Sequence, residues 1–230
     1  MIGIIGAMQT EVELLISKIE EAEKRTVSGI DFFSGRIENR EVVVAKCGIG
    51  KVFAAICAQT MILEYGVSLI INTGVGGAIS DELEIGDIAV SSAVVQHDMD
   101  TSAIGDEKGL VSGINKIYFE SDASAVDAVI LSGYELGITV KKGTIATGDK
   151  FIADSADRER IISQFGASAC EMEGGAIAHT AFVNGIPFVV VRAISDGANS
   201  DSAMDFPTFL AVAAKKSEAL TLALVEKYQK

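Results

Sequence analysis

Short apolar runs alternate along this chain with segments in which apolar residues recur at helical spacing. The run Ile2–Ile5, for example, is followed by Val12, Leu15, Ile16 and Ile19 on one helical face. Similar runs, bounded by glycine or polar turn residues, predict further strands. The predicted strands are Ile2–Ile5, Phe32–Ile37, Glu41–Lys46, Val67–Asn72, Ile88–Gln96, Thr139–Ala146 and Ile186–Ile194.

Strands that alternate with helical segments are typical of a sheet covered by helices. We therefore predict an α/β fold of three layers, with a central, mixed and twisted sheet flanked by helices that include Lys51–Tyr65 and Ala123–Leu136. The 230 residues contain no repeat and no low-complexity linker, so we expect a single domain spanning residues 1–230. The segment Asp98–Tyr118 is the least regular, and a long loop in a compact domain is often functional.

Charge and cysteine usage narrow the class of partners. A net charge of −13 argues against nucleic acid and against an anionic membrane surface, since both are bound through clustered Lys and Arg. Three cysteines without a CxxC pair are typical of reduced thiols, and with two distant histidines we expect neither a metal site nor a cofactor. No basic leader precedes the first strand and no apolar run approaches the ~18 residues of a membrane span, so we expect a cytoplasmic protein.

Acidic residues follow predicted strands near the end of the chain. Glu171 and Glu173 flank Met172 at a strand-to-helix junction, and Ser195 and Asp196 come directly after the strand Ile186–Ile194. Open α/β sheets bind ligands beyond the carboxyl ends of their strands. Asp196 is therefore either the first residue of a turn or a general acid.

Glu11 follows the first predicted strand. Thr10 resembles an N-cap, with Glu13 three residues later completing a capping box, which places Glu11 at the first helical position. Glu11 is then either a solvated acid favoured by the helix dipole or an acid that faces a ligand.

Two glycine-rich runs also follow strands. Gly48–Lys51 lacks the Ser or Thr of a phosphate-binding loop, and Gly74–Ile79, which contains Val75 and Gly76, lacks the last glycine of a dinucleotide-binding loop. Both runs would permit close approach of the backbone to a ligand. After a later strand, Phe151 and Ile152 could form a slot for a flat heterocycle or could be ordinary core residues.

Arg192 lies within an otherwise apolar strand. A buried arginine needs a carboxylate partner, and Glu173 or Glu11 could supply one. We expect His97 and His179 to be structural histidines whose hydrogen bonds are satisfied.

Several segments together resemble the 5′-methylthioadenosine/S-adenosylhomocysteine nucleosidase family of the nucleoside phosphorylase superfamily. The matching segments are G-I-I-G-A-M-Q-T-E-V, C-G-I-G-K-V, I-I-N-T-G, I-G-D-I-A-V, T-G-D-K-F-I, E-M-E-G-G-A-I-A-H, V-V-V-R-A-I-S-D and F-x-x-F-L-A-V-A-A-K from Phe206. They span nearly the whole chain in order. The resemblance implies a nucleoside phosphorylase-like fold that hydrolyses the N-glycosidic bond of 5′-thio-substituted adenosines, and possible substrates include 5′-deoxyadenosine.

The same resemblance implies roles for particular residues. Asp196 would protonate adenine N7, with Ser195 orienting it, and Glu11 would activate the attacking water with help from Arg192. Glu173 would bind the ribose hydroxyls and stabilise the cationic sugar. The remaining residues would complete the substrate site: Met172 and Glu171 beside Glu173, the main chain of Phe151 and Ile152 at the adenine edge, Val75 and Gly76 along the wall, and Ile49 and Phe206 in the 5′ pocket.

The family also implies a homodimer in which the 98–118 loop of one subunit completes the site of the other. Ile104 and Ser112 stand in that loop where some relatives have Phe and Pro, and Val75 stands where many have Ser. These departures leave the preference among 5′ substituents open.

Three alternatives remain. A phosphorylase is disfavoured because Glu11 stands where those enzymes typically place an arginine, and a carboxylate there repels phosphate. A hydrolase of another adenosine derivative, such as 6-amino-6-deoxyfutalosine, and a non-catalytic nucleoside-binding protein are also open.

Overall fold

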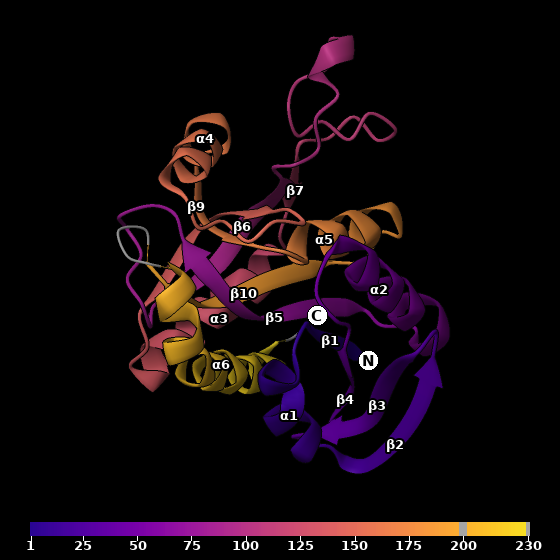
Figure 1. Cartoon of the computed structure of the whole chain (residues 1–230). Coiled ribbons are helices and arrows are strands. Elements are labelled where there is room, and N and C mark those ends of the chain that lie inside the picture. Colours follow the sequence, from indigo (N-terminus) through magenta and orange to yellow (C-terminus); the bar gives the residue numbers. More distant parts are fainter. Residues whose placement is uncertain (198–201, 229–230) are drawn as a thin grey trace.

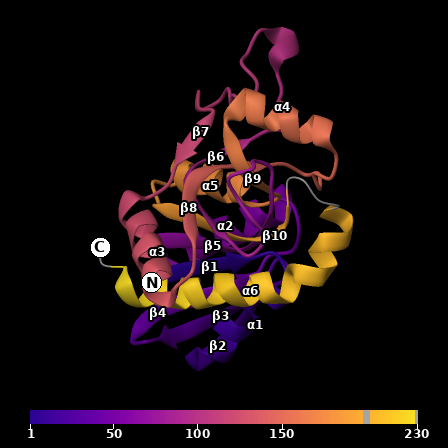
Figure 2. The ribbon, with the colours of Figure 1, turned by 90° about the vertical axis from the view of Figure 1, so that its left-hand side faces the viewer.

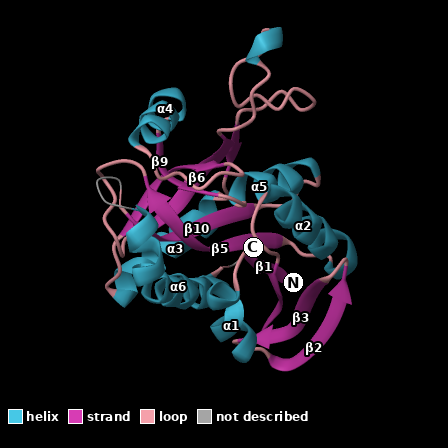
Figure 3. Ribbon diagram, viewed as in Figure 1, coloured by secondary structure: helices cyan, strands magenta, loops and turns pink. Residues whose placement is uncertain are grey.

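A mixed β-sheet runs through the centre of the molecule (Figures 1 and 3). The computed structural model describes residues 1–197 and 202–228, with the backbone alone for residues 202–207. In the described part, the strands follow the order β10-β6-β8-β9-β5-β1-β4-β3-β2, with β7 beside β6. The strands are β1 (Ile2–Gly6), β2 (Glu20–Val27), β3 (Ile30–Ile37), β4 (Arg40–Lys46), β5 (Leu69–Ala78), β6 (Ile88–Gln96), β7 (Tyr118–Glu120), β8 (Val140–Thr147), β9 (Ala167–Glu171) and β10 (Phe188–Asp196).

Strand β10 pairs with two neighbours, antiparallel to β6 and parallel to β5. Because β6 leads through β8 and β9 back to β5, these five strands close into a ring, and β1, β4, β3 and β2 extend the sheet from β5. The expected mixed α/β sheet is confirmed. The closure brings the ends of β5, β9 and β10 together. The pattern of apolar residues along the chain does not predict this closure.

Helices cover both faces of the sheet (Figures 1 and 2). Helices α1 (Gln9–Ser17), α3 (Ala123–Leu136) and α6 (Ser202–Lys227) pack together on one face, and α2 (Lys51–Tyr65) and α5 (Gly174–Val183) pack together on the other. Helix α4 (Ser155–Phe165) lies against β8 and β9. No helix of the described part is long and apolar enough to cross a membrane.

The continuous apolar runs of the central strands are explained by burial on both faces. Ile4 and Val44 join the core beneath α1, α3 and α6, whereas their neighbours Ile5 and Val43 join the core beneath α2 and α5. Successive side chains in a strand point to opposite faces. A strand covered by helices on both sides therefore has no polar face.

Three predicted elements, Lys51–Tyr65, Ile88–Gln96 and Ala123–Leu136, begin and end where the structure has them. The polar residues between the predicted strands Phe32–Ile37 and Glu41–Lys46 form the turn between β3 and β4, with Glu38 and Asn39 at positive φ of 49° and 62°. The sequence pattern missed β2, β7 and α4, and it indicated β9 only as a strand before the junction at Glu171, without its bounds. Seven of the eight residues of β2 are exposed, so this edge strand lacks the apolar alternation that would predict it.

Candidate active site

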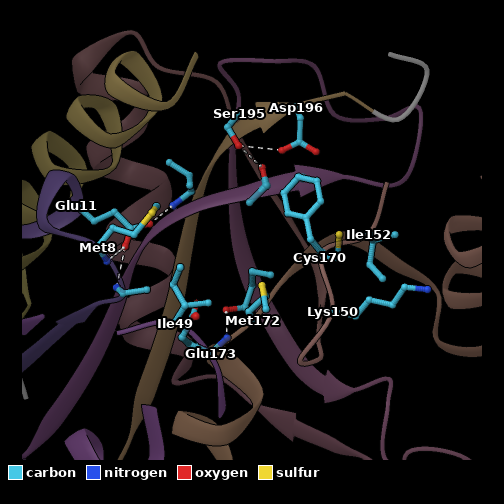
Figure 4. A pocket seen from close by; sticks show the side chains of 16 residues that line it. Met8, Glu11, Ile49, Lys150, Ile152, Cys170, Met172, Glu173, Ser195 and Asp196 are labelled. Carbon is cyan, nitrogen blue, oxygen red and sulfur yellow. Dashed lines mark hydrogen bonds between the residues drawn. The ribbon is translucent and has the colours of Figure 1, made fainter. Parts of the chain in front are cut away.

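A cavity of about 390 Å³ opens where β1, β9 and β10 end and where the second half of β5 passes them (Figure 4). Its walls combine apolar side chains with four carboxylates. The lining residues are Ala7, Met8, Glu11, Ile49, Val75, Gly76, Gly77, Lys150, Phe151, Ile152, Cys170, Glu171, Met172, Glu173, Ser195 and Asp196. Apolar walls with a few convergent polar groups are typical of small-molecule sites.

Glu11 lies on one side of the cavity and is almost fully buried, with 3% of its surface exposed. Its Oε2 accepts hydrogen bonds from the amides of Ala7 at 2.7 Å and Met8 at 2.8 Å, and its Oε1 accepts one from Val75 N at 3.0 Å. Burial raises the pKa of Glu11, although the charge of Arg192 and the three amides act in the other direction. The result is a fixed, desolvated carboxylate suited to accept a proton.

The expected start of α1 is corrected by this geometry. Met8 is the N-cap, not Thr10, and Glu11 is the third helical residue rather than the first. Glu11 therefore also makes the capping contact that the spacing assigned to Glu13, which is exposed. The interpretation of Glu11 as a solvated acid is wrong.

Asp196 lies across the cavity from Glu11, at the end of β10 (Figure 4). It is buried, with 3% of its surface exposed, and Ser195 Oγ lies 2.9 Å from its Oδ1 as a hydrogen-bond donor. A Cβ on Gly77 would lie 2.7 Å from Asp196 Oδ2, so the glycine lets this carboxylate lie against β5 without displacement. Asp196 thus lies at a strand end beside a ligand cavity.

Glu171 and Glu173 lie at the junction between β9 and α5 and make different contacts. Glu171 Oε2 accepts hydrogen bonds from the amides of Glu173 at 3.0 Å and Gly174 at 2.7 Å, and Oε1 accepts one from the Thr147 hydroxyl. Glu173 Oε1 accepts a hydrogen bond from Gly50 N at 2.8 Å. Burial and the nearby charge of Glu171 raise the pKa of Glu173 to about 7.

Arg192 is buried behind these acids, with 1% of its surface exposed. Its close partner is Glu171, to which it donates a hydrogen bond, and its Nη2 lies 3.8 Å from Glu173 Oε2. It also donates to the side chain and carbonyl of Asn72. Of the two partners expected from the sequence, Glu173 is within ion-pair distance, but the closest carboxylate is Glu171.

Most of the other residues expected from the sequence also line the cavity. Ile49, Val75 and Gly76 lie on its wall, as do Phe151, Ile152 and Met172. Arg192 is not on the wall. The segment 98–118 projects above β7 (Figure 1). Ile104 belongs to that segment and has 82% of its surface exposed. The side chain of Phe206 lies outside the described residues.

Five lining residues were not expected: Ala7, Met8, Gly77, Lys150 and Cys170. Gly77, Lys150 and Cys170 adjoin residues that were expected, and Ala7 and Met8 follow the end of β1, so taking the flanks of every strand end as candidates would have found them. Burial raises the pKa of Cys170 to about 12, with a further contribution from the charge of Asp196, so this thiol stays protonated.

The histidine expectation holds for one of the two residues. His179 Nδ1 lies 3.4 Å from Gln96 Nε2, and its ring stacks on Phe119. His97 differs, because both of its ring nitrogens are buried without a hydrogen-bond partner among the described residues. Within the same residues, no group of three His, Cys, Asp or Glu side chains is arranged to hold a metal ion.

Comparison with known proteins agrees with this geometry. Residues 1–226 match the family described as the phosphorylase superfamily. A 5′-methylthioadenosine/S-adenosylhomocysteine nucleosidase of Shewanella halifaxensis is 41% identical over 98% of this chain and 99% of its own length. The Neisseria meningitidis nucleosidase of that name, solved in complex with methylthio-immucillin-A, is 32% identical with a TM-score of 0.95, covering 99% of both chains. Futalosine hydrolase of Helicobacter pylori is 34% identical with a TM-score of 0.93, covering 99% of this chain and 97% of its own.

Proposed function

The chain belongs to the 5′-methylthioadenosine/S-adenosylhomocysteine nucleosidase family of the phosphorylase superfamily, and we propose that it releases adenine from both of the nucleosides in that name. The reaction is hydrolysis of the N-glycosidic bond, which leaves a 5′-thio-substituted ribose. One observation carries the proposal. Glu11 and Asp196 face one apolar cavity from opposite sides, with Glu173 on its wall between them (Figure 4).

Asp196 is the proposed general acid. Adenine is a poor leaving group as an anion and a good one once its N7 is protonated. A positioned acid contributes roughly 10²–10⁴-fold to such a step. The hydrogen bond from Ser195 to Asp196 Oδ1 helps to hold the carboxyl group in one orientation beside the cavity.

Glu11 is the proposed base that activates water. Three backbone amides hold its carboxylate in one orientation, so it needs no rearrangement when the water is deprotonated. The raised pKa of Glu11 makes it a stronger base than a solvated carboxylate. The expected help from Arg192 would be indirect, through its charge, because Arg192 lies behind Glu171.

Glu173 is the proposed ribose-binding residue. A carboxylate at this place accepts hydrogen bonds from sugar hydroxyls and stabilises the oxocarbenium-like sugar of the transition state. Oε2 of Glu171 already accepts hydrogen bonds from Arg192 and two amides, so this oxygen does not bind the sugar. We therefore assign Glu171 to positioning Glu173.

The charges around the cavity favour water over phosphate as the nucleophile. The described wall carries four carboxylates and one amine, Lys150, which forms an ion pair with Asp157. The start of α2 is also occupied, since Gly50 N donates to Glu173 and Lys51 N donates to Asp149. Phosphate needs cationic or amide donors that are still available. Phosphorolysis is therefore disfavoured.

Two surfaces support the proposed homodimer. Helix α2 exposes Val52, Phe53 and Leu63, at 71%, 51% and 71%, beside an α5 that exposes Phe182 and Val183. An apolar surface of this kind marks an interaction site. The arm formed by residues 98–118 projects from the body, and we propose that it covers the open edge of the cavity in a second subunit (Figure 1).

We also propose that the protein works in the cytoplasm. Cys47, Cys57 and Cys170 are buried and unpaired. Unpaired thiols are typical of proteins in reducing compartments.

The test is adenine release from 5′-methylthioadenosine, with and without phosphate. We expect equal release in both buffers. Release that requires phosphate would contradict the role of Glu11, and absence of release would contradict the nucleosidase. Aminodeoxyfutalosine belongs in the same assay, because futalosine hydrolase has the same fold at similar identity. Faster turnover of that compound would change the substrate but leave the reaction type intact.

A further inference from the structure

Lys51, Asp98 and Asp149 form a closed ring of polar contacts beside the cavity. Asp98 Oδ1 accepts a hydrogen bond from Lys51 Nζ at 2.7 Å, and Asp98 Oδ2 accepts one from Asp149 N at 3.0 Å. Asp149 Oδ1 closes the ring by accepting from Lys51 N at 2.8 Å. Each residue therefore contacts both of the others, although none of the three is on the cavity wall.

The three residues come from three loops that follow different strands. Lys51 begins α2 after the loop that carries Ile49, and Asp149 belongs to the loop that carries Phe151 and Ile152. Asp98 stands at the root of the arm 98–118, directly beyond β6. The ring therefore links two walls of the cavity to the arm.

Two glycines show how closely these loops are packed. Gly50 has a φ of +99°, and a Cβ there would lie 3.0 Å from Asp149 Oδ1. A Cβ on Gly148 would lie 2.4 Å from the buried His97 Nε2, so the loop backbone rests directly on that ring. Together with the hydrogen bond from His97 N to Thr147 O at 2.9 Å, these contacts leave the loops little freedom to move separately.

The contribution of the ring to stability is small. The side chains of Lys51 and Asp98 keep 21% and 30% of their surface exposed, and such ion pairs add little to the folded state. Partial burial acts to raise the pKa of Asp98, but the hydrogen bonds from Lys51 and Asp149 N hold it below its usual range. Asp98 therefore stays ionised and keeps both contacts at neutral pH.

We propose that Lys51, Asp98 and Asp149 are positioning residues, which keep the walls of the cavity in register and so set its affinity for substrate rather than the rate of bond cleavage. The inference rests on the proposed function in taking a 5′-thio-substituted adenosine as the ligand. It assigns a role to three side chains that touch neither the reacting atoms nor the cavity.

The test compares Lys51→Met and Asp98→Asn on 5′-methylthioadenosine. In each variant the loops that carry the cavity walls are freer to move, so they hold the substrate contacts in place less well. KM should therefore rise about tenfold. The kcat should change by less than about threefold. The KM of the double variant should be no higher than the higher KM of the two single variants, because either substitution alone already opens the ring. Lys51→Arg, which keeps the charge and the donors, should restore most of the affinity.

A matched control lies elsewhere on the surface. Lys24 Nζ and Asp31 Oδ2 are also 2.7 Å apart, between β2 and β3 and away from the cavity. Lys24→Met and Asp31→Asn should leave KM unchanged. The proposal would be overturned if KM rose equally in these controls. It would also be overturned if the ring variants showed a lower kcat or Tm with no change of KM.

Adenine binding, measured by calorimetry on the same variants, separates this proposal from the function. If wild-type protein releases no adenine from 5′-methylthioadenosine, the proposed function fails. The ring is then judged by binding alone. About tenfold weaker adenine binding in Asp98→Asn supports the proposal, and unchanged binding overturns it.

Discussion

At the scale of single residues, Glu11, Glu171, Glu173 and Asp196 carry the same functional group but have different neighbours. Backbone amides hold Glu11, an arginine and two amides hold Glu171, and a serine hydroxyl donates to Asp196. Glu173 has one amide donor, and burial together with the charge of neighbouring Glu171 raises its pKa to about 7. Environment, rather than residue type, separates their proposed roles.

The first prediction concerns the proposed acid. Asp196→Asn keeps the size of the side chain and an oxygen that can accept from Ser195, but its amide has no acidic proton to transfer. We expect kcat to fall by about 10²–10⁴-fold while the Kd for adenine changes little. Steady-state kinetics and calorimetry measure the two quantities. The exposed Asp127→Asn is the control, and an Asp196→Asn variant that keeps more than a tenth of the activity would contradict the assignment.

The second prediction uses the pKa of Glu173, which rises from 4.5 to about 7 on folding. The folded state then holds this proton more tightly, so the gain in stability is complete below pH 4.5 and is lost as pH rises through 7. At about 1.4 kcal/mol per pKa unit, the free energy of unfolding should fall by up to about 3 kcal/mol across that window. Urea unfolding at several pH values measures the slope.

Glu173→Gln should remove the part of this slope that Glu173 contributes, because the amide does not titrate, while buried Glu11 with its raised pKa keeps its own part. The exposed Glu159→Gln is the matched control and should keep the slope of the wild type. Parallel curves for wild type and Glu173→Gln would show that the prediction is wrong.

At the scale of elements, the site depends on how closely β5 approaches its neighbours. Gly74 lies against Glu11, and Gly77 lies against Asp196, so the glycines of one strand make room for both proposed catalytic carboxylates. The sequence indicated a close approach to a ligand at this run. In the structure, Val75, Gly76 and Gly77 line the cavity, and Gly74 and Gly77 also lie close to the protein's own acids.

The third prediction follows from that contact. Gly77→Ala places a methyl group 2.7 Å from Asp196 Oδ2, and overpacking of this kind costs about 1–3 kcal/mol. In an Asp196→Ala background the obstacle is gone, so the same substitution should cost clearly less. Urea unfolding of the four proteins of this cycle measures the coupling. Additive effects would mean that the carboxylate moves aside without cost.

At the scale of the whole molecule, the cavity is open along one edge. Ile49 and Phe151 line the cavity but remain 57% and 44% exposed. Ile104, on the arm 98–118, is 82% exposed and so does not pack against its own chain. In the proposed homodimer each arm covers the open edge in its partner.

The fourth prediction tests this exchange of arms. Ile104→Asp should raise KM for 5′-methylthioadenosine about tenfold, because a charge enters an apolar pocket. Tyr134→Asp, at a residue 84% exposed on α3, is the control and should have no effect. Mixing Ile104→Asp with Asp196→Asn should then restore activity, since a hybrid dimer has one site with both groups intact. A mixture with only the averaged activity would argue against a shared site.

Much of the fold was predictable because it rests on local chemistry. The boundaries of α2, β6 and α3 follow from apolar periodicity and from helix stop signals such as Gly66. The exposed edge strand β2 carries no such alternation, whereas α4 does have a helical spacing of buried residues, a cap at Asp154 and a stop at Gly166, which its polar composition obscured. The position of β2 follows from its antiparallel pairing with the neighbouring β3, so its own side chains give no apolar signal for it.

The sequence by itself determined the candidate acids, since Glu11, Glu173 and Asp196 follow strands and stand in motifs shared with one enzyme family. Only the tertiary structure decided what each acid touches. Burial, the choice of Glu171 as the partner of Arg192, and the ring at Asp98 all depend on residues far apart in the chain. Desolvation and hydrogen bonding act through space, and the closure of β10 onto β5 and β6 sets those distances.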